Sequence, residues 1–205
     1  PDRVQFEAVC GSDIARVRLG IPGRFSVYNA LTVIGCALCL GLDLEEIAAG
    51  LACAEGVLGR AEVVPTDTDY TVVIDYAHTP DALENVLRTI DEIRSANQRV
   101  IAICGCGGER DKSKRPEMAQ VAQKMADRVI VTSDNSRTEK TTDIMADIKA
   151  GMDLSGKAKS LFIEDREQAI RTAIMMAGQG ATILLAGKGH ETYQIIGTEK
   201  RHFDE

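Results

Sequence analysis

After residue 70, short apolar segments alternate with helical segments, and few folds are compatible with this order. The apolar segments are rich in β-branched residues and lie at residues 70–75, 99–104, 128–132, 159–163 and 181–186. Segments with helical periodicity lie between them, at residues 80–95, 116–126, 142–151 and 166–178. Strands that are apolar on both faces and joined through helices are typical of a parallel sheet covered on both sides. The pattern therefore predicts an α/β fold with a Rossmann-like, mostly parallel sheet for residues 59–205, and a last short strand at 191–196.

Residues 1–58 show no such alternation. Their predicted elements are, in order, strands at residues 4–10 and 14–20 and helices at residues 26–40 and 43–54. Asp43 and Glu46 have the spacing of a capping box, which marks the start of the second helix. Apolar residues at helical spacing predict the buried face of the first helix, namely Ala30, Val33, Ile34, Ala37 and Leu38. Because these elements do not make a complete domain, we interpret residues 1–58 as the C-terminal remnant of a preceding domain.

The composition excludes several classes of protein. With 205 residues, of which 27% are charged and 44% hydrophobic, the chain is typical of soluble globular proteins. A net charge of −7 argues against a general nucleic-acid-binding protein, which is usually basic. The longest apolar run, Ala30–Leu42, is too short to cross a membrane, and we expect it to form a buried helix. The sequence shows no basic segment followed by an apolar core, so no signal peptide is predicted.

The six cysteines are predicted to be free and buried, because unpaired cysteine is among the residues most often found inside proteins. They are Cys10, Cys36, Cys39, Cys53, Cys104 and Cys106. Cys36 and Cys39 have a CxxC spacing, but no second ligand pair accompanies them, so no metal site is predicted there. Free thiols are typical of a reducing compartment, and we therefore expect a cytoplasmic protein.

The segment Gly105–Pro116 follows the predicted strand at 99–104 and combines three glycines with six charged residues. Glycines at the end of a strand allow backbone N–H groups to approach an anion. Because a structural turn does not need this density of charge, the segment predicts the floor of a site for a charged ligand. Lys112, Lys114 and Arg115 are expected to face either a phosphate or water. A tight turn before a solvated helix is the alternative interpretation.

Polar clusters follow four of the predicted strands at their carboxyl ends. They lie at residues 75–80, 105–114, 133–137 and 187–191. The carboxyl ends of parallel strands share one edge of a sheet, and ligands of open α/β sheets bind beyond that edge. We therefore expect all four clusters to gather there.

Two of these clusters contain residue types that suit an amino-acid ligand. Asn135 and Arg137 supply an amide and a guanidinium two residues apart, and Glu191 is suited to an amino group. Arg110, in the glycine-rich segment, is able to form a forked pair with a carboxylate. Asp134 either braces its loop or forms an Asx turn before the next helix, which is the alternative interpretation of this cluster.

The other two clusters have less specific signals. Asp75 either accepts hydrogen bonds from a ligand or orients His78, and His78 is suited to contact with a nucleotide; a capped helix start is the alternative. Gly187 and Gly189 let the backbone approach a ligand. Gly187-Lys188 resembles the end of a P-loop, but Gly189 stands where Ser or Thr is required. Because no G-x-x-x-x-G-K-[ST] motif occurs, a site for ATP phosphates must come from elsewhere.

Six motifs, in order, resemble those of the Mur ligases. They are Gly23-Arg-Phe-Ser-Val-Tyr-Asn-Ala30, Gly59-Arg-Ala-Glu62, Asp75-Tyr-Ala-His-Thr-Pro80, Gly105-Cys-Gly-Gly-Glu-Arg-Asp-Lys-Ser-Lys-Arg-Pro116, Asp134-Asn-Ser-Arg137 and Gly187-Lys-Gly-His-Glu-Thr-Tyr-Gln-Ile195. Each motif is weak alone, but the ordered set is specific and covers nearly the whole chain. The chain is most similar to the branch of the family that adds the third residue of the peptidoglycan stem peptide.

The resemblance implies a cytoplasmic, ATP-dependent ligase with three domains, for the UDP-sugar, for ATP and for the incoming amino acid. ATP and Mg²⁺ would activate the carboxylate of UDP-MurNAc-L-Ala-D-Glu, and the amine of meso-diaminopimelate would attack the acyl phosphate. Residues 1–58 would end the central ATP-binding domain, and residues 59–205 would form the amino-acid-binding domain. ATP and Mg²⁺ would be bound mainly by the missing central domain. The fragment would be inactive alone, with no catalytic or metal-binding residue of its own.

The resemblance also implies roles for individual residues. Those that would bind meso-diaminopimelate are Arg110, Asp134, Asn135, Ser136, Arg137, Gly187 and Glu191. The two arginines would bind carboxylates, and Gly187 with Glu191 would receive the distal amino end. Those that would face the nucleotide are Asp75, Tyr76 and His78. The family motif for diaminopimelate is Asp-Asn-Pro-Arg, and Ser136 replaces its proline here.

Three alternatives remain open at this point. The first is an L-lysine-adding ligase of the same family, although Arg137 favours diaminopimelate, because the distal carboxylate of diaminopimelate needs a cation. A ligase of the folylpolyglutamate or cyanophycin type shares the Asp75-Tyr-Ala-His78 motif. A non-catalytic amino-acid-binding module would reuse the fold without the reaction, and an upstream P-loop would distinguish it from a ligase.

Overall fold

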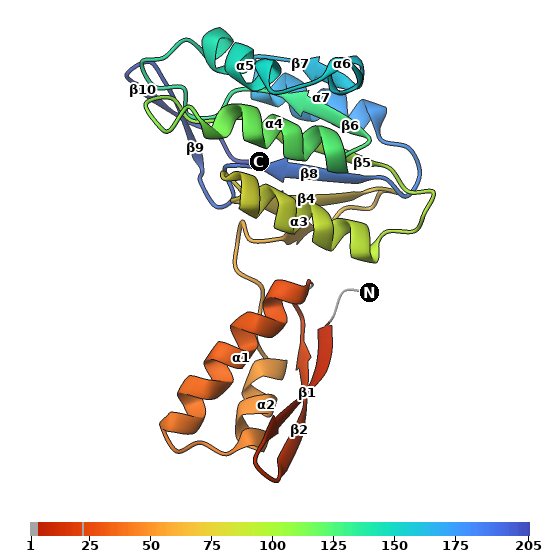
Figure 1. Ribbon diagram of the computed structural model, residues 1–205, viewed down its shortest axis with the longest axis vertical. Coiled ribbons are helices and arrows are strands. Elements are labelled where there is room, and N and C mark those ends of the chain that lie inside the picture. Colours follow the sequence, from red (N-terminus) through yellow and green to blue (C-terminus); the bar gives the residue numbers. More distant parts are fainter. Residues whose placement is uncertain (1–3, 22) are drawn as a thin grey trace. The chain divides into compact units, whose positions relative to one another are not determined.

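The computed structural model describes residues 4–21 and 23–205 of the chain (Figure 1). The chain divides into two compact units, Pro1–Val57 and Leu58–Glu205. No helix in the described ranges is both long enough and apolar enough to cross a membrane. Each unit has a hydrophobic core of its own, and the larger unit contains the sheet that the sequence predicts.

The first unit is a β-hairpin packed against two helices. Its elements are, in order, β1 (Val4–Cys10), β2 (Asp13–Leu19), α1 (Arg24–Cys39) and α2 (Leu44–Ala52). Alternate residues of β2 point into the core, where they meet apolar residues of both helices. The capping box is confirmed: the Asp43 carboxylate accepts the Glu46 N–H at 2.8 Å, and the Glu46 carboxylate accepts the Asp43 N–H at 3.3 Å.

Helix α1 is covered on one side, which differs from the buried helix expected at Ala30–Leu42. Ala30 and Ile34 are buried, but Val33 is 50% exposed and Leu40 is 82% exposed. Within the described part of this unit, the hairpin and α2 pack against the same side of α1. Apolar periodicity therefore located the helix correctly but did not reveal how many of its sides are covered.

The second unit contains a six-stranded sheet in the order β3-β4-β8-β5-β6-β7. Its strands are β3 (Glu62–Val64), β4 (Thr71–Asp75), β5 (Val100–Cys104), β6 (Arg128–Val131), β7 (Ser160–Phe162) and β8 (Thr182–Ala186). All pairs are parallel except the edge pair of β3 with β4. The predicted mostly parallel α/β fold is confirmed. A separate antiparallel hairpin, β9 (Tyr193–Ile196) with β10 (Glu199–His202), follows β8.

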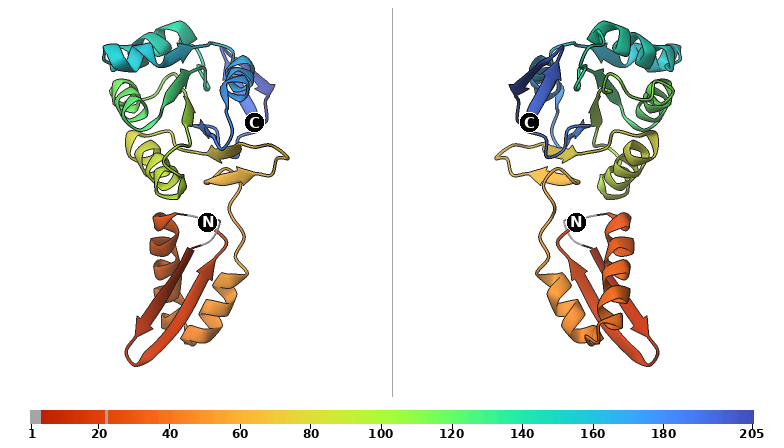
Figure 2. Two further views of the ribbon diagram at one scale, coloured as in Figure 1. Left: turned by 90° about the vertical axis from the view of Figure 1, so that its right-hand side faces the viewer. Right: turned by 90° about the vertical axis from the view of Figure 1, so that its left-hand side faces the viewer.

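Helices cover both faces of this sheet (Figure 2). They are α3 (Pro80–Ile93), α4 (Lys114–Met125), α5 (Thr141–Ala150), α6 (Leu154–Ala158) and α7 (Arg166–Met176). Along β5, Ala102 and Cys104 join the core beneath α3, α4 and α5, whereas Ile101 and Ile103 join the core beneath α7. Because both faces of β5 are covered, its sequence has no polar alternation.

The sequence did not predict three short elements, β3, α6 and β10. β3 has three residues and α6 has five, which is too short for periodicity to be visible. Helix α6 begins instead at an N-cap, where the Asp153 carboxylate accepts the Gly156 N–H at 2.6 Å. All residues of β10 are exposed, so no alternation of apolar side chains marks this strand.

The expectation that the cysteines are buried is wrong for four of the six. Those that are exposed are Cys10, Cys36, Cys39 and Cys53. All four belong to the first unit, whose thin core leaves much of each element uncovered. Cys104 and Cys106 are buried at the end of β5, and burial raises the pKa of these thiols to about 12 and about 11, respectively.

We expect a thiol-alkylating reagent at about pH 8 to discriminate between these two groups, because the thiolate is the reactive form. In the native chain, the four cysteines of the first unit should be labelled, whereas Cys104 and Cys106 should stay unmodified until the chain is unfolded. Mass spectrometry of the proteolytic peptides measures this directly. Native labelling of Cys104 at the rate of Cys53 would contradict the burial of the β5 terminus.

Candidate functional site

The loops that follow β4, β5, β6 and β8 meet at the carboxyl edge of the sheet. Main-chain hydrogen bonds join them: the Gly187 N–H donates to the Asp75 carbonyl at 2.9 Å, and the Gly108 N–H donates to the Asn135 carbonyl at 2.9 Å. The structure therefore brings together the four polar clusters of the sequence. This follows from the parallel topology, which places the ends of these strands at the same edge.

Two pairs of loops approach more closely than a side chain would permit. A Cβ atom at Gly108 would lie 1.9 Å from the Ser136 carbonyl oxygen. A Cβ atom at Gly59 would lie 2.1 Å from the His190 main-chain nitrogen. Because Cβ atoms essentially never come within 3.0 Å of such neighbours, glycine is required at both positions.

Asn135 connects the loop after β6 to the segment after β8. Its side-chain N–H donates to Glu191 Oε2 at 2.9 Å, and its Oδ1 accepts the Ile195 N–H at 2.9 Å. Because Asn135 is buried and both ends of its amide are engaged, its orientation is fixed. The neighbouring Asp134 is also buried, and its Oδ2 would lie 3.1 Å from a Cβ atom at Gly187. These four predicted site residues therefore form one cluster.

Arg137 has a left-handed backbone conformation, with a φ of 52°, which is uncommon for arginine. The β9 segment holds this conformation: the Arg137 N–H donates to the Ile195 carbonyl at 3.2 Å, and the Arg137 carbonyl accepts the Gly197 N–H at 2.7 Å. The guanidinium Nη1 donates to the Gly108 carbonyl at 2.8 Å, which directs the side chain toward the loop after β5. Ser136 is buried, and its carbonyl makes the close contact with Gly108.

Arg110 and Arg137 both lie close to Gly107. A Cβ atom at Gly107 would be 3.1 Å from Arg137 Nη1 and 3.6 Å from Arg110 Cγ. Arg110 is exposed and makes no hydrogen bond or ion pair with any residue in the described ranges. Two neighbouring guanidinium groups, one oriented by the main chain and one free, are suited to the carboxylates of a ligand.

Asp75, at the end of β4, is engaged by the protein itself. Its Oδ2 accepts the Ala61 N–H at 2.7 Å. Burial raises the pKa of the Asp75 carboxyl, and this hydrogen bond and the nearby Arg60 oppose the increase. Helix α3 does not need Asp75 as a cap, because the Thr79 hydroxyl accepts the Ala82 N–H at 3.3 Å.

Tyr76 lies among other rings and charges next to the cluster. Its ring centroid is 4.7 Å from that of His78 and 5.3 Å from that of His190, and the Arg60 guanidinium lies 4.9 Å from it. Burial raises the pKa of Tyr76, and the nearby Glu191 carboxylate raises it further. His78 is exposed. Tyr76 therefore lies in the field of the Glu191 carboxylate and packs beside the exposed His78 ring.

Arg115 is completely buried, which corrects the expectation that it faces a phosphate or water. Its guanidinium donates to Asp147 at 2.8 Å and makes two hydrogen bonds of 3.1 Å to Glu139. Lys112 also pairs with Glu139, at 3.2 Å, and Lys114 donates to a main-chain carbonyl in the loop after β4 at 2.8 Å. A run of basic residues in the sequence does not show which of them is buried. This ion cluster joins the start of α4 to α5 and to the loop after β6.

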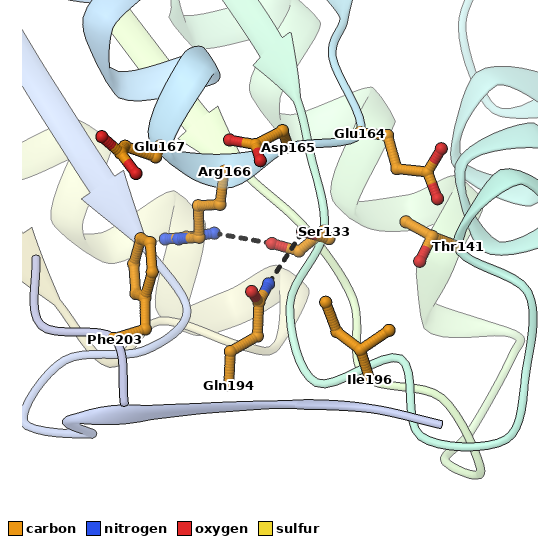
Figure 3. A pocket seen from close by; sticks show the side chains of 9 residues that line it. All are labelled: Ser133, Thr141, Glu164, Asp165, Arg166, Glu167, Gln194, Ile196 and Phe203. Carbon is orange, nitrogen blue, oxygen red and sulfur yellow. Dashed lines mark hydrogen bonds between the residues drawn. The ribbon is translucent and has the colours of Figure 1, made fainter. Parts of the chain in front are cut away.

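Sequence reasoning also missed two residues that support the loop after β6. A pocket of about 350 Å³ lies beside this loop, and Figure 3 shows Arg166 and Gln194 pointing toward Ser133 from opposite sides. Gln194 donates to the Ser133 hydroxyl at 2.8 Å, and Arg166 donates to the Ser133 carbonyl at 3.3 Å. Arg166 is fully buried and also pairs with Glu205. Arg166 lies in none of the sequence motifs, and Gln194 lies in the sixth motif but was given no role there.

We expect the contribution of Glu139 to stability to depend on pH. Hydrogen bonds from Arg115 hold the pKa of the Glu139 carboxyl at about 2, below its ordinary value of 4.5. A carboxyl whose pKa is lowered by folding adds stability above its unfolded pKa and loses it as the pH falls through the folded pKa. Urea unfolding should therefore show that Glu139→Gln reduces the free energy of unfolding more at about pH 7 than at about pH 3.

The matched control is Glu167→Gln, because Glu167 pairs with Arg171 on an exposed face of α7. An exposed pair of this kind contributes about 0.3–0.5 kcal/mol, so the control should change little at either pH. An equal loss of stability at both pH values for Glu139→Gln would refute the assignment.

We expect Gly108→Ala to force the loops after β5 and β6 apart. Overpacking of this kind costs roughly 1–3 kcal/mol, which urea or thermal unfolding will measure. Gly178→Ala is the control, because a Cβ atom there meets nothing within 4 Å. The control should stay within about 0.5 kcal/mol of the parent chain. Equal free energies of unfolding for the two variants would show that the loops accommodate the added methyl group without loss of stability.

The comparisons with known proteins agree with this arrangement of fold and loops. Residues 59–189 match the family described as Mur ligase, glutamate ligase domain. The chain therefore belongs to the Mur ligase family, which confirms the resemblance found in the sequence motifs. The match begins at the glycine that packs against the segment after β8 and extends through Gly187 and Gly189.

Two curated relatives of this chain and one solved structure carry the same protein name. The UDP-N-acetylmuramoyl-L-alanyl-D-glutamate--2,6-diaminopimelate ligase of Parabacteroides distasonis is 50% identical over 189 residues, which are 92% of this chain and 39% of the relative. The ligase of the same name from Clostridioides difficile is 46% identical over 204 residues, which are 100% of this chain and 42% of the relative. A solved structure of a ligase with this name matches with a TM-score of 0.69 and 40% sequence identity. The match covers 98% of this chain and 40% of the solved chain. The chain thus spans about two fifths of these relatives.

Proposed function

We propose that this chain is the C-terminal part of an ATP-dependent ligase that adds meso-diaminopimelate to UDP-MurNAc-L-Ala-D-Glu in peptidoglycan synthesis. The observation that carries the proposal is the position of two guanidinium groups, Arg110 and Arg137, in one cluster with the Glu191 carboxylate. Asn135 links the groups, because its carbonyl accepts from Arg137 at 3.3 Å and its side chain donates to Glu191. Diaminopimelate carries the complementary charges, and the relatives' names contain this amino acid.

The proposal gives each residue a role that its contacts support. Arg110 and Arg137 bind carboxylates of meso-diaminopimelate, and Glu191 binds its distal ammonium group. Asp134, Asn135 and Ser136 form the wall of the pocket, which their burial makes rigid. Gly187, with a φ of 120°, offers main chain where a side chain would approach Asp134. The task of these residues is to hold and orient the amino acid so that its other amine is available for reaction.

ATP and Mg²⁺ are proposed to be held mainly outside this chain. No P-loop motif occurs in the sequence, and no group of three His, Cys, Asp or Glu side chains in the described ranges is placed to hold a metal ion. The residues present therefore do not fit the phosphates and the metal by themselves. Asp75, Tyr76 and His78 are proposed to face the nucleotide, and the exposure of the His78 ring supports this most directly.

Residues 1–58 are proposed to be the end of the central ATP-binding domain, and residues 59–205 the amino-acid-binding domain. The exposed apolar side chains of the first unit support this assignment, because a complete domain would bury them. They include Tyr28, Leu31, Val33, Leu40 and Leu42. The proposed reaction would take place in the cytoplasm, where the nucleotide-linked substrate and ATP are present.

L-Lysine is the second candidate, because Ser136 replaces the proline of the family motif. In the structure, Ser136 contacts Gly108 through its main-chain carbonyl and not through its side chain. The neighbouring Asn135 donates to Glu191, and Arg137 donates to the Gly108 carbonyl. Arg137 stays directed toward the ligand side of the loop after β5. Lysine has no distal carboxylate to pair with this guanidinium, so diaminopimelate is favoured.

We expect Arg137→Asn to weaken the binding of meso-diaminopimelate to the chain by roughly 10–100-fold, because a charge-assisted hydrogen bond is lost. Asparagine tolerates the left-handed backbone, so the loop should keep its conformation. NMR titration of the isotopically labelled chain measures the change, and shifts at Arg110, Asn135 and Glu191 identify the site. Titration with L-lysine serves as the comparison.

The matched control is Arg128→Asn, because Arg128 is exposed at the opposite end of the strand that leads to Arg137. The Arg128→Asn variant should bind diaminopimelate as tightly as the parent chain does. Saturable shifts with lysine alone would assign the chain to a lysine-adding ligase. Shifts with neither amino acid would count against recognition by this unit alone.

A further inference from the structure

Lys188 is a buried cation that the proposed function leaves without a role. Its side chain is 0% exposed, and a buried charge requires a partner. The Lys188 ammonium lies 3.4 Å from Glu191 Oε2 and 5.6 Å from the centroid of the Tyr193 ring. Within the described ranges, Glu191 is the carboxylate with which it forms an ion pair. The Lys188 ammonium therefore lies next to the proposed binding group for the ligand's ammonium.

Glu191 meets its two protein partners at the same oxygen. Lys188 and Asn135 both donate to Oε2, and Oε1 accepts no hydrogen bond from the described residues. The main chain fixes this arrangement, because the Glu191 N–H donates to the Lys188 carbonyl at 2.9 Å. Gly187 and Gly189 on either side have positive φ values of 120° and 51°, which turn the lysine inward. Oε1 is thus left for a ligand, in the field of the lysine.

We propose that Lys188 is a specificity-determining residue, whose buried charge selects a ligand without net charge over one with a net positive charge. The inference rests on the proposed function and deepens it, because the two ligands concerned are meso-diaminopimelate and lysine. Lys188 does not need to touch either ligand. It acts through charge, by opposing the arrival of a second cation at Glu191.

The charges of the two ligands determine the sign of this effect. At neutral pH, diaminopimelate has two ammonium and two carboxylate groups, whereas lysine has two ammonium groups and one carboxylate. Lys188 repels the distal ammonium of both ligands. In diaminopimelate, the attraction of Lys188 for the distal carboxylate offsets this repulsion, and in lysine nothing offsets it. Charges several ångströms apart in a partly buried site still interact strongly, so the lysine complex is weakened more. Rejection by repulsion complements the attraction that Arg137 supplies.

The test is calorimetric titration of the 205-residue chain and its variant Lys188→Met with meso-diaminopimelate and with L-lysine. Methionine is unbranched and one heavy atom shorter than lysine, and it carries no charge. The measured quantity is the dissociation constant for lysine divided by that for diaminopimelate. We expect this ratio to fall about tenfold in Lys188→Met. Lys200→Met is the control, because Lys200 also lies over the Tyr193 ring, at 3.7 Å, but is exposed. The control should keep the parent ratio.

If Lys188 has only a structural role, Lys188→Met should bind both ligands more weakly by the same factor. The ratio of dissociation constants would then stay unchanged, which would overturn the inference while the proposed function stands. Failure of the parent chain to bind either amino acid would overturn the proposed function and the inference with it. If Lys188→Met does not fold, Lys188→Gln replaces it. Glutamine also removes the charge but keeps a polar end for the contact with Glu191, so the ratio should again fall, and a ratio that stays or rises would refute the inference.

Discussion

Main-chain contact between the loops at the carboxyl edge of the sheet is the interaction on which the rest of the site depends. The loop after β5 touches the loop after β6 at Gly108 and Ser136, and the segment before β3 touches the segment after β8 at Gly59 and Gly189. Because backbone meets backbone, the spacing of the loops does not depend on side-chain rotamers. The side chains of the candidate site are therefore attached to a frame whose dimensions are set by hydrogen bonds and by the absence of Cβ atoms.

Three completely buried cations reinforce this frame, and each meets a carboxylate. Arg115, at the start of α4, pairs with Glu139 in the loop after β6 and with Asp147 in α5, and Arg166 joins α7 to the loop after β6. Lys188 meets Glu191 inside the candidate site itself. Buried ion pairs add little net stability, since desolvation opposes their attraction, but removal of one partner is costly. Their main effect here is to fix which loop lies against which, and Lys188 is proposed in addition to set the charge that a ligand encounters.

Much of this arrangement was accessible from the sequence because the second unit obeys simple rules. Runs without polar alternation identified strands covered on both faces, and parallel order placed Asp75, Gly108, Asn135 and Gly187 at one edge. The burial of individual residues was not accessible in this way. Arg115 was expected to face a phosphate or water, and Lys188 was noted only as part of a P-loop-like dipeptide. The burial of Arg115 depends on carboxylates distant in sequence, and that of Lys188 on the conformations of the neighbouring glycines. The exposed cysteines of the first unit were missed because the general tendency of free cysteine to be buried says nothing about how many sides of a strand or helix are covered.

The two arginines of the site differ in a way that bears on recognition. Arg137 is held by its backbone hydrogen bonds to β9 and by its contact with the Gly108 carbonyl, so little side-chain entropy remains to be lost on binding. Arg110 is exposed and unpaired among the described residues, so it must be ordered when a ligand arrives. A preoriented guanidinium discriminates better between ligands with and without a second carboxylate, because its geometry cannot adapt. In the proposed site, discrimination would therefore belong to the loop after β6 and its neighbours Glu191 and Lys188, whereas Arg110 would contribute chiefly attraction.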